Sequence, residues 1–317
     1  MVFKKLLGAL GVGGPSVDTV LATPRVQPGG VVTGEVRVTG GTQDVEIEHA
    51  ALGLLTRVGV EHGDHEGDRT VEFHRAVVAG RFRLAAGQDQ VIPFSLPLPW
   101  EAPVTEVLGQ HLHGMNLGVR TELAVAKAVD KGDLDPLAVV PLPSQQRVLE
   151  AFSQLGFQFR KADLEQGRIH GVHQELPFYQ EIEFYPPPQF AGSLNEVELT
   201  FVTSPHELVV VLEADKRGGF FSSGQDAFGR FHVPHAEAMS TDWASLIGGW
   251  LQQVGQRRQQ FGGGHGGHRG GHGYGGHGGH HGGVGGMAAG AAAGFVGGMV
   301  LGEVFEEAGE EFFGEEE

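Results

Sequence analysis

Hydrophobic and polar residues alternate along most of the first 130 positions, as in strands with one buried face. Every second residue from Val32 to Val38 is small or apolar, and Val119, Thr121, Leu123 and Val125 repeat this period. We predict strands at Ser16–Thr23, Val31–Thr39, Asp44–Glu61, Thr70–Ala79, Arg81–Leu84, Gln90–Leu98 and Leu117–Val129, with Thr70–Ala79 paired to Arg81–Leu84 and a polar hairpin loop at His62–Arg69. Many short strands joined by Gly/Pro turns indicate a sandwich or barrel.

A second β region follows residues 131–143, whose prolines and charges predict a hinge. Its predicted strands are Phe157–Phe159, Tyr179–Tyr185, Glu196–Thr203 and Leu208–Ala214, and Gly218–Gly229 is predicted as a loop. Two segments instead have helical spacing. One runs from Ser144 as N-cap to Leu155, and the other is Thr241–Gln253, with an apolar stripe of Trp243, Leu246, Ile247, Trp250 and Leu251.

The C-terminal part has a different composition. Residues 262–283 comprise fourteen glycines, six histidines, Arg269 and Tyr274, and such a segment cannot bury enough apolar surface to order its backbone. Val284–Gly302 has no charged residue, and glycine recurs every fourth position at Gly286, Gly290, Gly294, Gly298 and Gly302. On a helix these glycines share one face and allow close packing, as in a glycine zipper.

These patterns give a two-domain all-β chain with a low-complexity tail. The predicted parts are a lead-in helix at 1–15, an N-terminal β-sandwich at 16–130, a hinge at 131–143, a C-terminal β-sandwich at 144–258, a disordered Gly/His linker at 259–283, a glycine-zipper helix at 284–302 and an acidic tail at 303–317. The lead-in helix has Leu6, Leu7 and Leu10 on one face. It lacks the cleavage site of a signal peptide, so we expect no export.

Charge and cysteine content narrow the function classes. The formal net charge is −17 and no long basic cluster occurs, so nucleic-acid binding is not expected. The absence of cysteine removes disulfides, thiolate metal sites and cysteine nucleophiles. A cytoplasmic location is consistent with this composition, with a membrane-peripheral position as the alternative.

The order of several segments resembles the bacterial sporulation-control (SpoOM) family over roughly residues 1–255. The residues that carry the resemblance are Phe3-Lys4-Lys5-Leu6-Leu7, Val17-Asp18-Thr19-Val20-Leu21, Pro28-Gly29-Gly30 with Val32-Thr33-Gly34, the segment from Ile92-Pro93-Phe94 to Pro103-Val104-Thr105, Glu181-Ile182-Glu183-Phe184-Tyr185-Pro186-Pro187 and the Trp243/Trp250 helix. The resemblance implies two arrestin-like antiparallel β-sandwiches with short flanking helices. It also implies a cytosolic regulator of developmental signalling that binds proteins and has no known chemistry.

No motif of a known enzyme class occurs in the chain. G-x-S-x-G, H-E-x-x-H, the Walker loop and the dinucleotide-binding fingerprint are all missing, so we predict no catalytic residues, no cofactor and no enzyme activity.

Three groups of residues could bind metal. The six tail histidines, His265, His268, His272, His277, His280 and His281, could chelate Zn²⁺, Ni²⁺ or Cu²⁺, or could lie in a plain spacer. The loop with His62, Asp64, His65, Glu66 and Asp68 could bind a metal, but its composition also fits a solvated hairpin tip. His111 and His113 alternate on a strand-like stretch and fit a surface position better than a metal site.

Two other segments offer contacts. Val284–Gly302 could self-associate into a homo-oligomer, insert into a membrane or stay disordered, and its regular period favours self-association. Phe220, Phe221 and Phe228 could form an exposed partner site, although capping of the second core fits their composition better.

We predict a non-enzymatic regulator that binds a protein partner through sheet edges and loops. The alternatives are an assembly or membrane-peripheral protein driven by the glycine zipper, and a metal-binding protein that uses the histidine-rich tail. The partner's identity does not follow from the sequence.

Overall fold

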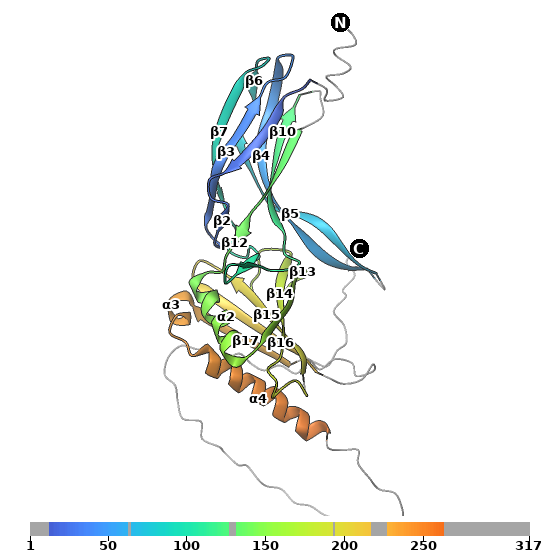
Figure 1. Cartoon of the computed structure of the whole chain (residues 1–317), viewed down its shortest axis with the longest axis vertical. Coiled ribbons are helices and arrows are strands. Elements are labelled where there is room, and N and C mark those ends of the chain that lie inside the picture. The colour runs from blue at the N-terminus through green and yellow to red at the C-terminus, as the bar shows by residue number, and fades with distance from the viewer. Residues whose placement is uncertain (1–12, 63–64, 127–130, 193, 217–226, 263–317) are drawn as a thin grey trace, which may run out of the picture.

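The computed structural model describes residues 13–62, 65–126, 131–192, 194–216 and 227–262, which form mainly antiparallel sheets and a few helices (Figure 1). This confirms the predicted all-β class. The strands are β1 (Ser16–Leu21), β2 (Arg25–Val26), β3 (Val31–Thr39), β4 (Val45–His62), β5 (His65–Ala79), β6 (Phe82–Leu84), β7 (Asp89–Pro97), β8 (Glu106–Val107), β9 (Gln110–His111), β10 (Leu117–Val125), β11 (Lys131–Pro136), β12 (Ala138–Val139), β13 (Gln158–Gln166), β14 (Phe178–Tyr185), β15 (Leu194–Thr203), β16 (Glu207–Lys216) and β17 (Ala227–Pro234). The helices are α2 (Pro143–Leu155), α3 (His235–Ala238) and α4 (Trp243–Gly262).

The N-terminal half, residues 13–142, is a sandwich. A three-stranded sheet in the order β1-β3-β7 packs against β4, β10 and their neighbours. The alternation in the sequence sets the buried face, because Val32, Val36 and Val38 from β3 meet Ile47 and Leu52 from β4 in one core. Each such side chain, fully buried, contributes about 1.5–3 kcal/mol to the free energy of unfolding.

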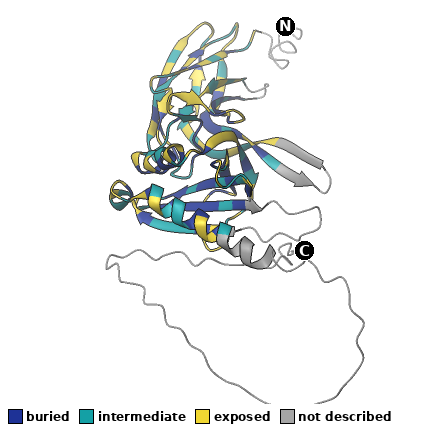
Figure 2. Cartoon of the chain, turned by 60° about the horizontal axis from the view of Figure 1, so that its bottom comes forward, coloured by how far each residue is buried: buried dark blue, intermediate teal, exposed yellow. Residues whose placement is uncertain are grey.

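The C-terminal half, residues 143–262, contains the sheet β13-β14-β15-β16-β17. Helices supply its second layer, because Phe152 of α2 and Trp243, Ile247 and Leu251 of α4 pack on one face of this sheet. We call the opposite face the outer face; it carries many polar side chains and a small apolar cluster of Val202, Val209 and Val211. Figure 2 shows buried residues along the strands of both halves.

Strand β4 belongs to both halves. It pairs with β5 and β10 along most of its length and meets β13 in parallel at Gly59 and Glu165, which joins the halves in one ten-stranded sheet. Four residues of the N-terminal half also lie in the C-terminal core, namely Val58, Val104, Leu112 and Met115. The two halves therefore share backbone pairing and buried apolar surface.

The segment after β7 is fixed to the C-terminal half by hydrogen bonds. The side chain of Gln180 accepts from the Val104 N–H (2.9 Å) and donates to the Val104 carbonyl (2.7 Å), and Thr203 donates to the Trp100 carbonyl. The Trp100 indole also lies where Gly29, at φ 71°, would carry a Cβ. The predicted turn at Pro28-Gly29-Gly30 thus needs glycine for its conformation and for this contact.

Several predicted elements differ from the structure in the N-terminal half. Strand β6 pairs with β4 instead of β5, and the predicted hairpin loop at 62–69 is largely strand, because β4 and β5 pair as far as His62 and His65. Residues 131–143, predicted as a hinge, contain β11 on the edge beside β10 and β12 beside β2. A run of prolines does not exclude strands at a sheet edge.

The C-terminal half differs at three places. Helix α2 begins at Pro143, because proline lacks an N–H and fits the first helical turn, and Leu142 takes the N-cap position. The hydroxyl of Ser144, the predicted N-cap, instead lies 2.8 Å from His235 Nδ1. Helix α4 continues to Gly262. The predicted loop 218–229 runs into β17, where the Trp250 indole lies against Gly229.

Among the described residues, no helix combines the length and the apolar character needed to cross a membrane. The predicted lead-in helix lies mostly outside the described residues, as do the Gly/His linker and the glycine zipper.

Candidate functional site

The outer face of the C-terminal sheet collects carboxylates from four neighbouring strands. Apolar residues on these strands point to the helices, so the alternate positions point outward. The outward carboxylates are Asp163 and Glu165 on β13, Glu181 and Glu183 on β14, Glu196 and Glu198 on β15, and Glu213 on β16.

The strand register places like charges directly opposite each other. Glu183 on β14 is the cross-strand partner of Glu198, and Glu198 is the partner of Glu213 on β16. Asp163 on β13 likewise faces Glu181. Like charges at directly opposed positions destabilise a sheet unless cations lie near them.

A cavity of about 540 Å³ lies over these residues. Glu181, Glu198 and Glu213 line it from the sheet, and Phe228 of β17 lines it with 38% of its surface exposed. We call this space the acidic cavity. Of the three phenylalanines predicted to be a partner site or a core cap, Phe228 lies at this cavity, and Phe220 and Phe221 lie outside the described residues.

Two titrating groups in the cavity have raised pKa values. Burial raises the pKa of Glu181 to about 9, and repulsion from Glu198, Asp163 and other carboxylates adds to this shift. Burial and the same kind of repulsion also raise the pKa of Tyr179, which lines the cavity beside Glu181. Glu181 is therefore protonated at neutral pH, whereas an approaching cation favours its ionised form.

One edge of the acidic face is neutralised by ion pairs. The nearly buried Glu183 is 2.5 Å from the Arg160 guanidinium and 2.8 Å from the Lys161 ammonium, and Lys161 is 2.6 Å from Asp163. Burial lowers the pKa of Lys161, but hydrogen bonds and charge from Asp163 and Glu183 outweigh it, so the pKa is raised overall.

The rim of the cavity is a hydrogen-bonded loop between β13 and β14. The Gln174 amide donates to the carbonyls of Gly167, Leu176 and Phe178, and its oxygen accepts from the Ile169 N–H. Two arginines that line the cavity also brace this loop. Arg168 donates to the Gln174 carbonyl (2.6 Å), and Arg230 donates to the His170 carbonyl (2.5 Å).

The rim also depends on a glycine and on a carboxylate from the other half. Gly171 has φ 71°, and the Arg230 guanidinium occupies the space of its absent Cβ. The Glu101 carboxylate accepts the N–H groups of Glu175 and Leu176, at 2.7 to 2.9 Å.

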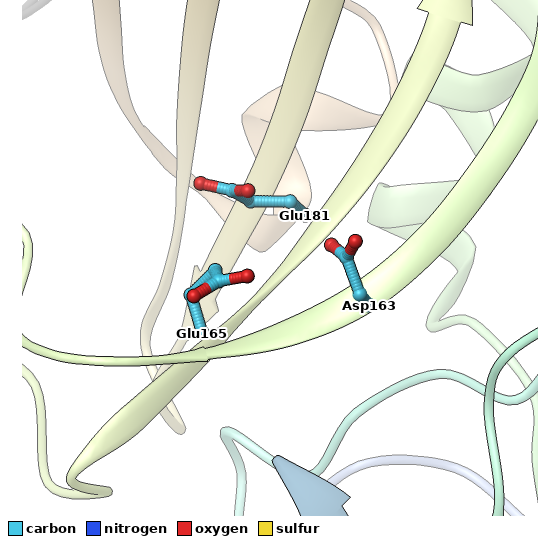
Figure 3. Close-up of side chains that lie close together, drawn as sticks. All are labelled: Asp163, Glu165 and Glu181. Carbon is cyan, nitrogen blue, oxygen red and sulfur yellow. The ribbon is translucent and has the colours of Figure 1, made fainter. Parts of the chain in front are cut away.

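Three carboxylates at the edge of the cavity have the spacing of a metal site. Oxygens of Asp163, Glu165 and Glu181 lie within 4.8 Å of one another (Figure 3), as do those of Glu181, Glu183 and Glu198. Oδ1 of Asp163 is buried and has no hydrogen-bond partner among the described atoms. Oxygen-only donors suit Ca²⁺ or Mg²⁺, and not the zinc or nickel that the tail histidines could bind.

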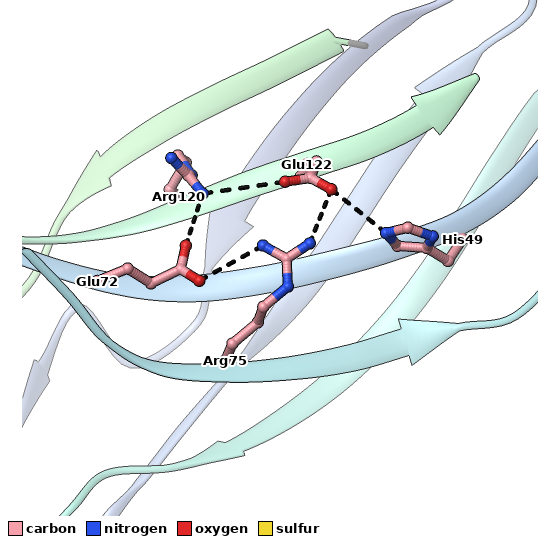
Figure 4. Close-up of polar contacts among 5 residues, drawn as sticks. All are labelled: His49, Glu72, Arg75, Arg120 and Glu122. Atoms are coloured by element: carbon pink, nitrogen blue, oxygen red, sulfur yellow. Dashed lines mark hydrogen bonds and ion pairs between the residues drawn. The ribbon is translucent and has the colours of Figure 1, made fainter. Parts of the chain in front are cut away.

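The outer face of the N-terminal sheet carries opposite charges instead. Arg75 on β5 is 2.7 Å from Glu122 and 3.5 Å from Glu72, while Arg120 is 2.6 Å from Glu72 and His49 is 3.3 Å from Glu122 (Figure 4). The hydrogen bond from Arg75 lowers the pKa of Glu122. This network satisfies its own charges, so the acidic cavity is the stronger candidate for a binding site.

The other predicted site residues are not brought together. His111 and His113 are both exposed, on either side of the buried Leu112, and neither belongs to a metal-type group among the described residues. The side chains of the hairpin tip around His62 and His65 lie outside the described residues, and so do the six tail histidines and the zipper glycines. Those predictions stay untested.

The acidic cavity was not predicted, although the sequence contains a signal for it. Acidic residues alternate with apolar ones in Asp163-Leu164-Glu165, Glu181-Ile182-Glu183 and Glu196-Val197-Glu198. The alternation that marks the buried face of these strands therefore also marks the carboxylates of the opposite face.

Comparison with known proteins identifies relatives that cover most of the described chain. A model of the family described as SpoOM protein matches residues 3–218. The sporulation-control protein spo0M of Bacillus subtilis (strain 168) is 34% identical over 216 residues, which is 68% of this chain and 81% of that protein. The crystal structure of Spo0M from Bacillus subtilis has a TM-score of 0.67 to this structure at 28% identity, over 76% of this chain and 99% of that one. The family match includes every strand that contributes a carboxylate to the acidic face.

Proposed function

Because the chain belongs to the bacterial sporulation-control (SpoOM) family, we propose that it is a cytoplasmic regulator of sporulation that acts by binding a protein partner. In this proposal the chain is an adaptor and performs no catalysis. The acidic cavity is its binding site, and the partner presents a segment rich in lysine or arginine.

The observation that carries this proposal is a cavity lined by Glu181, Glu198 and Glu213, of which Glu198 and Glu213 are direct cross-strand partners. A cationic side chain placed there lies close to these carboxylates. It also gains charge-assisted hydrogen bonds, which are about twice as strong as neutral ones. Apolar surface from Val211 and Phe228 can cover the aliphatic part of a lysine or arginine side chain.

Binding should release a proton. Since burial and nearby carboxylates raise the pKa of Glu181 to about 9, this group is protonated in the empty cavity at neutral pH. A bound cation lowers that pKa and expels the proton. The affinity for a basic segment should therefore rise as the pH increases from about 6 toward 9.

The direct test is a titration of the full chain with a short fluorescein-labelled Lys/Ser peptide, followed by fluorescence anisotropy. The variant Glu198→Gln/Glu213→Gln removes two cavity charges, and Glu46→Gln/Glu48→Gln removes two exposed charges on β4 as a matched control. We expect the cavity variant to weaken binding by about tenfold, or about 1.4 kcal/mol, and the control to change it less than twofold. An equal loss in both variants would mean that only net charge matters.

A titration with Ca²⁺ tests whether the carboxylate groups at the edge of the cavity bind a metal ion instead of a peptide. Competition between Ca²⁺ and the peptide at micromolar concentration would favour a divalent-cation site at Asp163, Glu165 and Glu181 over a peptide site. The proposal is supported if Ca²⁺ weakens peptide binding only at salt concentrations that screen all charges.

The same variants define the biological partner. The full chain and the two Gln variants are used as bait in lysate of a sporulating culture, and bound proteins are identified by mass spectrometry. The proposal expects a partner retained by wild type and by the β4 control and lost by the cavity variant.

A further inference from the structure

The loop between β13 and β14, which forms the rim of the acidic cavity, also crosses the outer face of the C-terminal sheet. We call residues 167–177 the strap. Neighbouring antiparallel strands need a connection of only about 2–5 residues. The strap is longer, and it extends toward the far edge of the sheet, where Arg230 of β17 donates to the His170 carbonyl. It therefore covers strands that are not its neighbours in the chain.

The strap covers a small apolar group on this face, which we call the valine cluster. The cluster consists of Val202 of β15 and of Val209 and Val211 of β16, and their side chains are only 4% to 7% exposed. Ile169 and Val172 of the strap pack against them. Because side chains on the outer side of a sheet otherwise face water, the strap supplies the cover that these valines need.

A tight turn presents both apolar side chains of the strap to the cluster. The Val172 N–H donates to the Ile169 carbonyl (3.2 Å), and Gly171 between them has φ 71°. A positive φ at the third position of such a turn favours glycine. The turn thus holds Ile169 and Val172 close together, and both reach the valine cluster.

The ends of the strap and its middle are held in different ways. The Gln174 side chain, which is 5% exposed, bonds to the backbone at both ends of the loop, and the Glu101 carboxylate accepts the N–H groups of Glu175 and Leu176. The middle meets the sheet through its two apolar side chains and the bond from Arg230. Apolar packing is not directional, so another segment with similar side chains can replace it.

The valine cluster and the acidic cavity are continuous. Val211 belongs to the cluster and also lines the cavity, and Ile169 and Arg168 of the strap line the cavity beside it. The strap therefore places two apolar side chains and a neighbouring arginine on this part of the outer face. Because this segment is seated there in the structure, it shows which kind of side chain the face accepts.

We propose that the strap is an autoinhibitory occupant of the partner site, and that the partner displaces it. The displacing segment carries two apolar side chains, spaced like Ile169 and Val172, beside a basic residue. This inference rests on the proposed function, because it extends the binding site from the acidic cavity to the valine cluster. Displacement of the strap exposes the three valines as the floor of the extended site.

The first test asks whether a loosened strap lets a copy of its own sequence bind. The probe is a fluorescein-labelled peptide with the sequence of residues 167–174, titrated into the full chain and followed by fluorescence anisotropy. In Ile169→Ser/Val172→Ser the strap loses its apolar contacts, while the valine cluster is unchanged. We expect this variant to bind the probe about tenfold more tightly than wild type, because the site is open in a larger fraction of molecules.

Two controls accompany this test. Val77→Ser/Leu134→Ser removes two exposed apolar side chains of the N-terminal half and should match wild type. A peptide with serine at the positions of Ile169 and Val172 should bind neither protein. Amide hydrogen exchange across 167–177 should be faster in the opened variant than in wild type. Equal probe affinity in the opened variant and wild type, or unchanged exchange in the strap, overturns the inference.

A further variant opens the strap without changing its side chains, and it carries the test if the double serine variant does not fold. Arg230→Gln removes the hydrogen bond to the His170 carbonyl and should raise the probe affinity about threefold or more. Adding Val209→Thr places a hydroxyl in the valine cluster and should lower the affinity again, by about tenfold. Probe binding that is insensitive to Val209→Thr lies elsewhere on the protein and contradicts the inference.

The Lys/Ser peptide separates this inference from the proposed function. If the probe binds the opened variants and the Lys/Ser peptide binds no form of the protein, the acidic cavity fails as the site for basic segments and the strap inference stands. If the Lys/Ser peptide binds wild type through the cavity and the probe binds no variant, the proposed function stands and the strap is only a structural cover.

Discussion

Charged side chains are arranged differently on the two outer sheet faces of this protein. On the N-terminal half, Arg75 and Arg120 lie among the glutamates of β5 and β10, and each arginine pairs with a glutamate on the far side of the intervening strand β4. On the C-terminal half, Glu183, Glu198 and Glu213 face one another across three strands. The first face carries alternating charges of opposite sign, whereas the second places carboxylates in register with one another. In the proposed function, the second face takes part in binding.

The ion pairs of Glu183 lie at the edge of the acidic face. Their removal should have the largest effect on the free energy of unfolding. We expect Arg160→Gln/Lys161→Gln to lower the free energy of unfolding by about 3 kcal/mol, because Glu183 has 5% of its side chain exposed and would lose its cations. Urea denaturation measures this. Adding Glu183→Gln to the double variant should recover most of the loss, and a loss that persists would contradict this assignment.

Removing the Glu181 carboxyl group from the cavity should have the next largest effect, and it should raise the free energy of unfolding. The folded state keeps a proton on Glu181 up to a pKa of about 9, whereas the unfolded chain releases it near the ordinary value of 4.5. Between these values the unfolded state binds fewer protons, so the free energy of unfolding falls as pH rises. We expect Glu181→Gln to stabilise the protein by about 2 kcal/mol at pH 8 and to have little effect at pH 4.5.

Urea denaturation of wild type and Glu181→Gln across this pH range checks the prediction, with Glu48→Gln as an exposed control. A stabilisation that is equal at pH 4.5 and pH 8 would show that titration of Glu181 is not its cause.

Removing one arginine from the ion-pair network on the N-terminal outer face should have the smallest effect on the free energy of unfolding. We expect Arg75→Gln to cost about 1 kcal/mol or less, because the network is partly exposed. Arg75 lowers the pKa of Glu122, so this contribution is present above the ordinary carboxyl pKa and is lost as pH falls through the folded value. Thermal denaturation should show that the cost shrinks at low pH and at about 1 M salt, where the screening length is about 3 Å.

The matched control for Arg75→Gln is Arg83→Gln, which removes an exposed ion pair with Asp44. We expect no measurable change in its melting temperature. A loss as large as that of Arg75→Gln would mean that the network is no more than a set of ordinary surface pairs.

Periodicity in the sequence predicted most of the strands because alternation is a local property. Val31–Thr39 is a strand with the predicted bounds, and Val197 and Leu199 of β15 are buried as expected. Elements that depend on distant partners were missed. Gly229 resembles a loop residue until Trp250, twenty-one positions later, explains why a side chain is absent there. Similarly, Ser144 is a good N-cap by residue type, but Pro143 starts the helix, so the N-cap lies two residues earlier at Leu142.

The candidate site could not be predicted for a related reason. The acidic residues of β13 to β16 are visible in the sequence, but only the strand order and register show that Glu183, Glu198 and Glu213 are direct neighbours. A shift of one residue in any pairing would move a glutamate to the buried face. Which charged residues become neighbours on a sheet therefore depends on the strand register. The alternation of residues within one strand does not specify that register.

The sharing of β4 between the halves has a consequence for the order of synthesis. Val58, Val104, Leu112 and Met115 are made early, but they become buried among side chains of α2, β13 to β17 and α4, which follow them in the chain. The first half to leave the ribosome thus carries an apolar surface that stays uncovered until about a hundred further residues have emerged, and at about 5–20 residues per second this takes several seconds. Nascent chains of this protein are accordingly exposed to aggregation, and to chaperones, for that interval.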